Sequence, residues 1–197
     1  MLVVGDLKDF LDEDYDKLEK RINRTTGILV KDLKVKDLIF DGDTVIDPNT
    51  GVYILSKKGK VQYVGKCGSK SFQERVPAHF DIRSDAWFGA YIGHIALMEK
   101  HGRNKYNKIR NKGVEKKKLT TEEMVSACKV ALNSNLKLVK AKNEAKGGGC
   151  DYPSKLEKLL RVMLRPEFNS CKAGGTADKE VQSIKSSSKL GDILKKI

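Results

Sequence analysis

Two tyrosines close together in the sequence have the chemistry to act on a phosphate ester. Tyr53 ends the tripeptide Gly51-Val52-Tyr53, and Tyr63 begins the tripeptide Tyr63-Val64-Gly65. The turn Lys57-Lys58-Gly59 between them predicts a β-hairpin that places the two phenols on neighbouring strands. A phenol can hydrogen-bond a phosphate oxygen, and its phenolate can take a proton from water. A cross-strand aromatic pair that only stabilises the hairpin is the structural alternative.

Arg75 and His79 follow the hairpin and are four residues apart. On a helix, side chains with this spacing point the same way, so both could reach a cleft beside the hairpin. Pro77 lies between them and would remove a helical hydrogen bond unless it occupies the first turn of the helix. This leaves Arg75 at the edge of the helix, and Arg83 is the alternative arginine.

Glu157 lies on the most regular helix that the sequence predicts. Pro153 provides a favoured first residue, and the helix stops at Arg165-Pro166. Apolar residues recur at helical spacing along it: Leu156, Leu159, Leu160, Met163 and Leu164. Glu157 falls at the border of this stripe, where a partly desolvated carboxylate suits a hard divalent cation. The alternative is an ordinary boundary glutamate paired with Lys155, Lys158 or Arg161.

Together these residues resemble the signature of the GIY-YIG nuclease superfamily. The two tripeptides are similar to its name-giving motifs, and Arg75 with His79 is similar to its Arg and His pair. Glu157 followed by Pro166-Glu167-Phe168-Asn169 is similar to its closing segment. Pro77 and a connection two residues longer before Arg75 depart from the family pattern. The resemblance covers roughly residues 50–170 and includes an insertion.

The resemblance implies metal-dependent hydrolysis of a phosphodiester bond. Tyr53 would be the base, Tyr63 would hydrogen-bond the phosphate or the water, and Arg75 would bind the phosphate. His79 would relay the proton or orient Tyr53, and Glu157 would hold one Mg²⁺ or Mn²⁺ against the leaving 3′ oxygen. A free tyrosine has a pKa of about 10, so the base needs cationic neighbours. The residues expected to support the site are Gly51, Gly65, Lys66 and Asn169.

The charge of the chain independently favours a nucleic-acid partner. The formal net charge is +13, and it is unevenly distributed. Residues 1–50 carry a net charge of −4, whereas residues 51–197 carry +17. A surface with this excess attracts polyphosphate and releases counterions when it binds, so we expect salt-sensitive association with DNA, most readily double-stranded. The alternative is a lysine-rich face that is only solvated.

A basic segment between the second predicted strand and the third is the candidate for target recognition. Residues 100–118 contain nine Lys or Arg and one Glu, interleaved with Tyr106 and three asparagines. Such side chains can contact phosphates and base edges. The candidate DNA-binding residues are Arg103, Asn104, Lys105, Lys108, Arg110, Lys112, Lys116, Lys117 and Lys118. We expect core packing for Trp87, Phe88 and Tyr91, and structural roles for the lone histidines His94 and His101.

These elements predict an α/β (α+β) fold, with a three-stranded antiparallel sheet of GIY-YIG type flanked by helices. Residues 1–49 form an N-terminal extension, with a helix over 6–21 and then one or two strands or an arm. Residues 50–172 form the nuclease-like domain, with a helical insertion over about 81–135. The third strand is expected at 136–141, a capping box at Thr120 opens a helix to about 133, and residues 173–197 form a polar tail.

The composition excludes a membrane protein and a disulfide scaffold. The N-terminus has neither a basic start nor a sustained apolar run, so we expect a cytoplasmic protein that is not secreted. Four cysteines without a C-x-x-C pair indicate free thiols. The preferred function is a compact restriction-like or phage-encoded or mobile-element-encoded endonuclease. An inactive nucleic-acid-binding protein on the same fold, a homing or repair nuclease, and a homodimer remain open alternatives.

Overall fold

The computed structural model describes residues 2–46, 50–68, 70–83, 91–109, 118–142, 144, 150–169 and 188–197. Its strands are β1 (Val3–Asp6), β2 (Ile28–Leu29), β3 (Phe40–Asp41), β4 (Thr44–Val45), β5 (Gly51–Lys57), β6 (Lys60–Cys67) and β7 (Asn135–Lys140). Its α-helices are α1 (Tyr15–Arg24), α2 (Phe72–Arg75), α3 (Tyr91–Ile109), α5 (Thr121–Ala131), α6 (Tyr152–Leu164) and α8 (Leu190–Lys196). The described residues also form the 3₁₀ turns η1 (Leu7–Phe10), η2 (Val30–Asp32), η3 (Val35–Leu38) and η4 (Pro77–Phe80).

The predicted hairpin is present and lies in a mixed sheet. β5 pairs antiparallel with β6 on one side and with β7 on the other, in the order β1-β7-β5-β6. β1 joins β7 in parallel, and β2 pairs antiparallel with the other half of β7. The described sheet therefore has five strands of mixed orientation, and it is larger than the three-stranded sheet predicted from the sequence.

The N-terminal extension shares this sheet and its core. β1 and β2 come from residues 1–49, so the predicted N-terminal extension contributes two strands to the sheet that carries the hairpin. The helix predicted over 6–21 is instead a 3₁₀ turn followed by α1. At the other end, the predicted tail includes α8, while residues 173–187 lie outside the described part of the chain.

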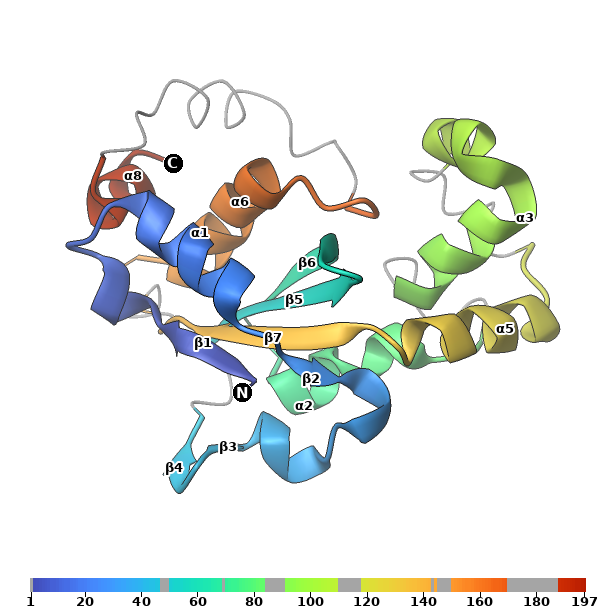
Figure 1. Ribbon diagram of the computed structural model, residues 1–197, viewed down its shortest axis with the longest axis horizontal. Helices are drawn as coiled ribbons and strands as arrows, with labels where there is room; N and C mark the ends of the chain where they lie inside the picture. The colour runs from blue at the N-terminus through green and yellow to red at the C-terminus, as the bar shows by residue number, and fades with distance from the viewer. Residues whose placement is uncertain are drawn as a thin grey trace.

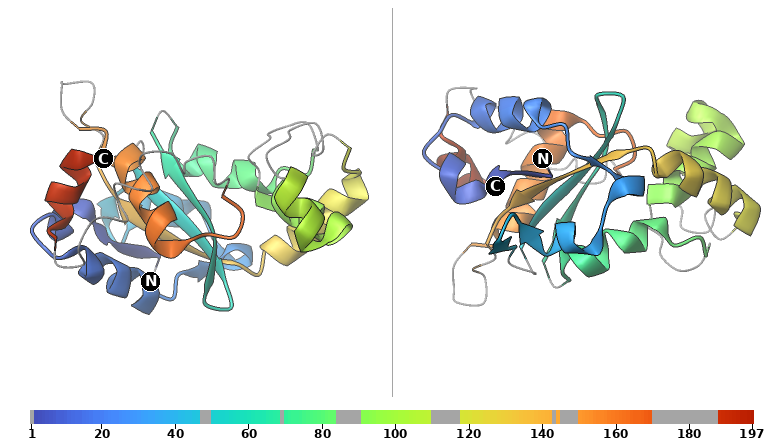
Figure 2. Two further views of the ribbon diagram at one scale, coloured as in Figure 1. Left: turned by 90° about the horizontal axis from the view of Figure 1, so that it is seen from above. Right: turned by 60° about the horizontal axis from the view of Figure 1, so that its bottom comes forward.

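Two apolar layers cover the two faces of the sheet because side chains alternate along each strand. Val52 and Ile54 pack with α1, α6 and α8, whereas Tyr53 and Leu55 pack with residues from α2, α3 and α5. Figure 1 shows α1, α6 and α8 together beside the sheet. Figure 2 shows α3 and α5, which pack on each other, at the end of the molecule away from α8.

Local signals place the helices that matter for the site. Thr120 and Glu123 form the predicted capping box at the start of α5, and Pro153 lies in the first turn of α6. The sequence of α3 contains Gly102, whose φ of 71° interrupts the helix and divides it into two segments. The three cysteines in the described residues form no disulfide, and Cys171 lies outside them. No described helix is both long and apolar enough to cross a membrane.

Candidate active site

The two hairpin tyrosines lie on one face of the sheet. Tyr53 is opposite Gly65 and Tyr63 is opposite Leu55, so the phenols are diagonal neighbours with ring centroids 6.3 Å apart. The ring of Tyr53 lies across Gly65, where an added Cβ would be 2.2 Å from the Tyr53 hydroxyl oxygen. Gly51 has a φ of 147°, and a Cβ there would be 2.4 Å from the Val139 carbonyl oxygen. At both positions, therefore, any side chain larger than that of glycine would clash with its neighbours.

His79 is held between Tyr53 and the start of α3. Ser71 and Glu74 cap the short helix α2, and Pro77 begins the 3₁₀ turn that contains His79, so proline removes no helical hydrogen bond. The His79 side chain is completely buried, and its Nε2 hydrogen-bonds the Tyr53 hydroxyl. Its Nδ1 accepts the backbone N–H of Tyr91 at 3.1 Å.

These two contacts define the tautomer of His79. A backbone N–H can only donate, so Nδ1 carries no proton and the proton of the neutral ring resides on Nε2. Nε2–H therefore donates to the Tyr53 oxygen and favours a phenolate there. Of the two roles predicted for His79, orienting Tyr53 agrees with this geometry. Relay of the Tyr53 proton through Nε2 would require that Nε2 first lose its own proton.

Of the two arginines predicted as candidates, Arg75 is the one whose charge acts on both tyrosines. It lies at the end of α2, and its positive charge lowers the pKa of both Tyr53 and Tyr63 against the opposing effect of burial. Arg83, the alternative arginine, instead donates from Nε to the Asp81 carboxylate at 3.0 Å. The geometry therefore favours Arg75 over Arg83.

Burial dominates the titration of the two phenols. Desolvation raises the pKa of Tyr53 far above its ordinary value, and it raises the pKa of Tyr63 to about 12. Tyr53 has no exposed surface, whereas Tyr63 and Arg75 are half-buried. Both tyrosines are thus neutral in the free protein at neutral pH, and Tyr63 is the one nearer to solvent.

Glu157 approaches the tyrosines from α6. Desolvation raises the pKa of its carboxyl group, and the charges of Arg161, Lys66 and Arg75 oppose that shift. Its charge in turn acts on both Tyr63 and Tyr53. One half-buried carboxylate therefore shares a site with two phenols and several cations.

Two cations surround this carboxylate in addition to Arg75. Lys66 donates to the Ser154 hydroxyl at 2.5 Å, and Ser154 hydrogen-bonds Asp151, the residue that caps α6. Arg161 is four residues after Glu157 on the same helix, and its charge acts on both Glu157 and Tyr63. Arg161 was predicted only as an ion-pair partner of an ordinary glutamate. Its i, i+4 spacing from Glu157 was the available signal for a place in the site.

A single Mg²⁺ or Mn²⁺ could bind here only by sharing its ligands between one protein carboxylate, water and a phosphate. The described residues contain no group of three or more His, Cys, Asp or Glu side chains that could form a protein cage for a metal. Magnesium commonly binds through one or two carboxylates, waters and substrate phosphate oxygens. Glu157 is the residue that would hold the ion in such an arrangement.

Asn169 fixes the middle of β6. Its side-chain oxygen accepts the Val64 N–H at 2.7 Å, and its amide donates to the Val64 carbonyl at 2.6 Å. Phe168 adds a backbone bond to the Gln62 carbonyl at 2.8 Å. The segment after α6 therefore lies along β6 and braces the strand that carries Tyr63. This is the supporting role expected for Asn169.

The basic segment of the insertion is partly described. Arg103, Asn104, Lys105 and Lys108 are exposed on α3, and Lys118 is exposed before α5. The Arg103 guanidinium forms an ion pair with the Glu167 carboxylate. Trp87, Phe88, Arg110, Lys112, Lys116 and Lys117 lie outside the described residues.

Two other ring side chains of α3, Tyr91 and His94, are buried and hydrogen-bonded. Tyr91 is completely buried and hydrogen-bonds Ser134 at 2.9 Å. His94 is buried, and its Nδ1 lies 3.0 Å from the Tyr106 hydroxyl. Core packing for Tyr91 and a structural role for His94 are consistent with these contacts.

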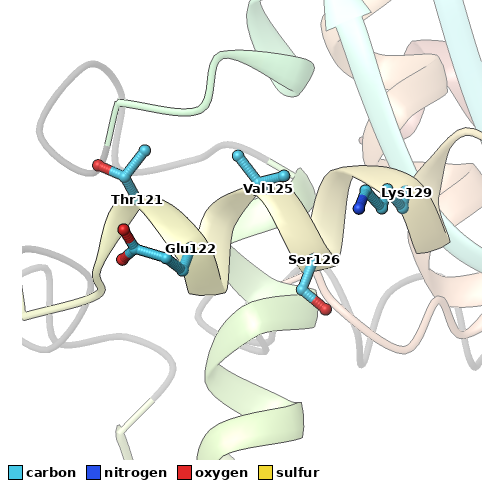
Figure 3. Close-up of a pocket in the computed structure, with 5 residues that line it drawn as sticks. All are labelled: Thr121, Glu122, Val125, Ser126 and Lys129. Carbon is cyan, nitrogen blue, oxygen red and sulfur yellow. The ribbon is translucent and has the colours of Figure 1, made fainter.

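Two hollows on the described surface lie away from the tyrosines. One, of about 340 Å³, lies on α5 and is lined by Thr121, Glu122, Val125, Ser126 and Lys129 (Figure 3). The other, of about 440 Å³, is lined by Lys36, Asp37, Phe40, Gly42 and Asp43. Neither contains a residue of the predicted site.

In comparisons with protein-family models, curated proteins and solved structures, the chain had no match.

Proposed function

We propose that the protein is a metal-dependent DNA endonuclease of GIY-YIG type that hydrolyses phosphodiester bonds. The observation that carries this proposal is the convergence of separate elements on one small region. Tyr53 and Tyr63 come from the hairpin, Arg75 and His79 from the segment after it, and Glu157 from α6. The antiparallel pairing of β6, β5 and β7 supports the three-stranded core of that family, to which β1 and β2 would be additions.

In the proposed reaction each residue has a chemical task. Arg75 binds the anionic phosphate, and the half-buried Tyr63 hydrogen-bonds a phosphate oxygen. Tyr53 first loses its own proton to solvent, and His79 stabilises the phenolate through Nε2–H. The phenolate then takes a proton from the attacking water and becomes a neutral phenol again. Because Tyr53 has no exposed surface in the free protein, this step requires the side chains that cover it to move when DNA binds.

Glu157 and Lys66 complete the site. A divalent cation held by Glu157 would stabilise the negative charge on the leaving 3′ oxygen. The charge of the cation would also stabilise the ionised form of Glu157, which burial disfavours in the free protein. Lys66, fixed by Ser154, contributes positive charge beside the carboxylate.

DNA is the substrate that the charge of the molecule favours. Residues 51–197 carry a net charge of +17, and exposed cations of α3 lie on the same chain segment as Tyr91, which contacts His79. Within the family, a compact restriction-like enzyme or one encoded by a phage or mobile element is preferred over a homing or repair nuclease. The rival function is a basic nucleic-acid-binding protein without catalysis.

Cleavage of plasmid DNA separates the enzyme from the binder. The full-length protein should convert supercoiled plasmid to nicked or linear forms in Mg²⁺ or Mn²⁺ and not in EDTA. Tyr53→Phe removes only a hydroxyl, so cleavage should slow by roughly a hundredfold or more while the fold is retained. Tyr15→Phe, which removes a hydroxyl from α1 on the other face of the sheet, is the matched control. No cleavage by the parent protein despite DNA binding would favour the binding protein.

A further inference from the structure

The helix α3 contacts the proposed active site at three positions along its length. At its start, the Tyr91 N–H hydrogen-bonds His79. In its first segment, the ring of His94 lies 6.4 Å from that of Tyr63, centroid to centroid. In its second segment, after the kink at Gly102, Arg103 forms an ion pair with Glu167. The insertion that carries the basic residues is therefore in direct contact with the catalytic strand and with its neighbours.

Glu167 is the charged group at the last of these contacts. Its side chain is 7% exposed, and its carboxylate accepts the Gln62 amide at 2.8 Å and lies 3.6 Å from Lys60 Nζ. Burial would raise the pKa of this carboxyl group, but hydrogen bonds from Gln62 and Arg103, together with the positive charges of Lys60 and Arg103, outweigh burial and lower the pKa. Glu167 is thus an ionised, nearly buried group bonded to both α3 and β6.

Packing alone does not require a charge at this position. Replacing a buried ion pair by apolar side chains of similar size is often neutral or stabilising, so a buried pair is weak evidence for stability. What the carboxylate adds is a directional link, because it holds Arg103 on α3 and Gln62, the neighbour of Tyr63, at the same time. A phosphate that attracts Arg103 would act on this link directly.

We propose that Glu167 is a positioning residue that couples DNA binding by the basic segment of α3, residues 103–108, to Tyr63 on β6. This inference rests on the proposed nuclease function. Its expected consequence is that the enzyme cuts only where the basic segment has engaged DNA. The coupling would act on the rate of cleavage and leave the affinity for DNA to the other cations.

Glu167→Gln keeps the shape of the side chain and a hydrogen bond to Gln62, but it removes the ion pairs with Arg103 and Lys60. We expect kcat on plasmid DNA to fall at least tenfold, while Kd for DNA changes by less than about threefold, because a transition-state interaction is lost. Arg103→Gln should have the same effect on kcat, and the double variant should be no worse than either single variant. Glu99→Gln, an equal change of charge on the exposed face of α3, is the control.

Arg103→Lys keeps a cation that can pair with Glu167 and attract phosphate, so it should recover part of the kcat that Arg103→Gln loses. A merely structural role would not give a loss of kcat without a change in thermal midpoint. Unchanged kcat in Glu167→Gln, or losses in kcat that follow the thermal midpoint across all variants, would overturn the proposal.

Hydrogen exchange of β6 tests the coupling without catalysis. In EDTA, bound DNA should slow exchange of the backbone amides of residues 61–64 in the parent protein, and it should not do so in Glu167→Gln under saturating DNA. Equal protection in both proteins would overturn the proposal even if the parent cuts DNA normally. A parent protein that binds DNA without cutting it would instead reject the proposed function, and the exchange result would still decide the coupling.

Discussion

His79 lies between Tyr53, the proposed base, and Tyr91 at the start of α3, and it hydrogen-bonds both residues. Because the Tyr91 N–H occupies Nδ1, the neutral imidazole can only donate to the phenol oxygen. If His79 were protonated, its Nδ1 could no longer accept the Tyr91 N–H. The charged ring would also repel the start of α3, where the helix dipole is positive. The geometry of the site therefore suits a neutral His79.

Glu157 allows a direct test of the electrostatics of the free site. Desolvation raises the pKa of its carboxyl group above the unfolded-state value, so the folded protein binds more protons between the two pKa values. Stability should therefore fall as pH rises through this range, because the penalty applies to the charged form. Glu157→Gln should raise the thermal midpoint at neutral pH, by about 2–4 °C for each kcal/mol relieved. The gain should vanish below about pH 4.

A second glutamate provides the control for this measurement. Glu74 is exposed, and hydrogen bonds from Ser71 lower its pKa, so Glu74→Gln should not raise the midpoint at any pH. Calorimetry of the three proteins from pH 4 to pH 8 gives the comparison. A lower midpoint for Glu157→Gln at neutral pH would mean that ion pairs with Arg161, Lys66 or Arg75 outweigh desolvation.

At the scale of elements, the brace between Asn169 and β6 is the clearest determinant of strand position. Asn169→Ala would leave the buried N–H and C=O of Val64 without their partner, and each unsatisfied group costs about 1–3 kcal/mol. We expect a loss of about 2–4 kcal/mol in the free energy of unfolding, measured in urea, and slower cleavage because Tyr63 is adjacent.

The chain offers a matched control for that substitution. Asn133 is exposed and donates one hydrogen bond to the Lys129 carbonyl at 3.1 Å. Asn133→Ala should change the free energy of unfolding by less than about 0.5 kcal/mol, as most surface substitutions do. Equal effects of the two alanine variants would show that Asn169 does not brace the strand.

Local sequence signals predicted the elements that build the site. The hairpin was readable from its turn, α5 from its capping box and α6 from its apolar stripe, because each signal lies within the element itself. The addition of β1 and β2 to β7 was not readable, because strand pairing over more than a hundred residues leaves no local pattern. The role of Asn169 could be predicted only from the family resemblance.

Contacts between distant residues also explain what was missed within the site. The tautomer of His79 depends on the N–H of Tyr91, and the partner of Arg103 is Glu167, sixty-four residues away. Neither pair has the sequence spacing of neighbours on a helix or a hairpin, so neither contact could be predicted from the sequence. Arg161 is the exception, since its helical distance from Glu157 was visible.

At the scale of the whole molecule, the uneven charge predicts how binding depends on salt. Contacts with six phosphates would give a slope of about −5 in a plot of log K against log salt. Replacing the exposed Lys105 and Lys108 by Gln should flatten the slope by about 2 and weaken binding to all sequences alike. The binding constants can be measured by fluorescence anisotropy over a range of salt concentrations.

The control for this slope uses cations on another part of the surface. Lys31 and Lys36 are exposed in the acidic N-terminal region, so replacing both by Gln should leave the slope unchanged. Substitution of Arg110 should instead relax preference at particular bases, whereas Arg103 already pairs with Glu167. Identical slopes for all variants would assign binding to a surface other than the basic segment of α3.

The most direct test of the proposed site is the cleavage activity of Glu157→Gln on plasmid DNA in Mg²⁺, with DNA affinity measured on the same samples. The basic surface should provide affinity and Glu157 should hold the cation, so binding and cleavage should separate. We predict a loss of cleavage of roughly a hundredfold or more with a change in Kd of less than about threefold. Cleavage by Glu157→Gln at the rate of the parent protein would contradict the assignment of Glu157 as the metal ligand, and with it the proposed site.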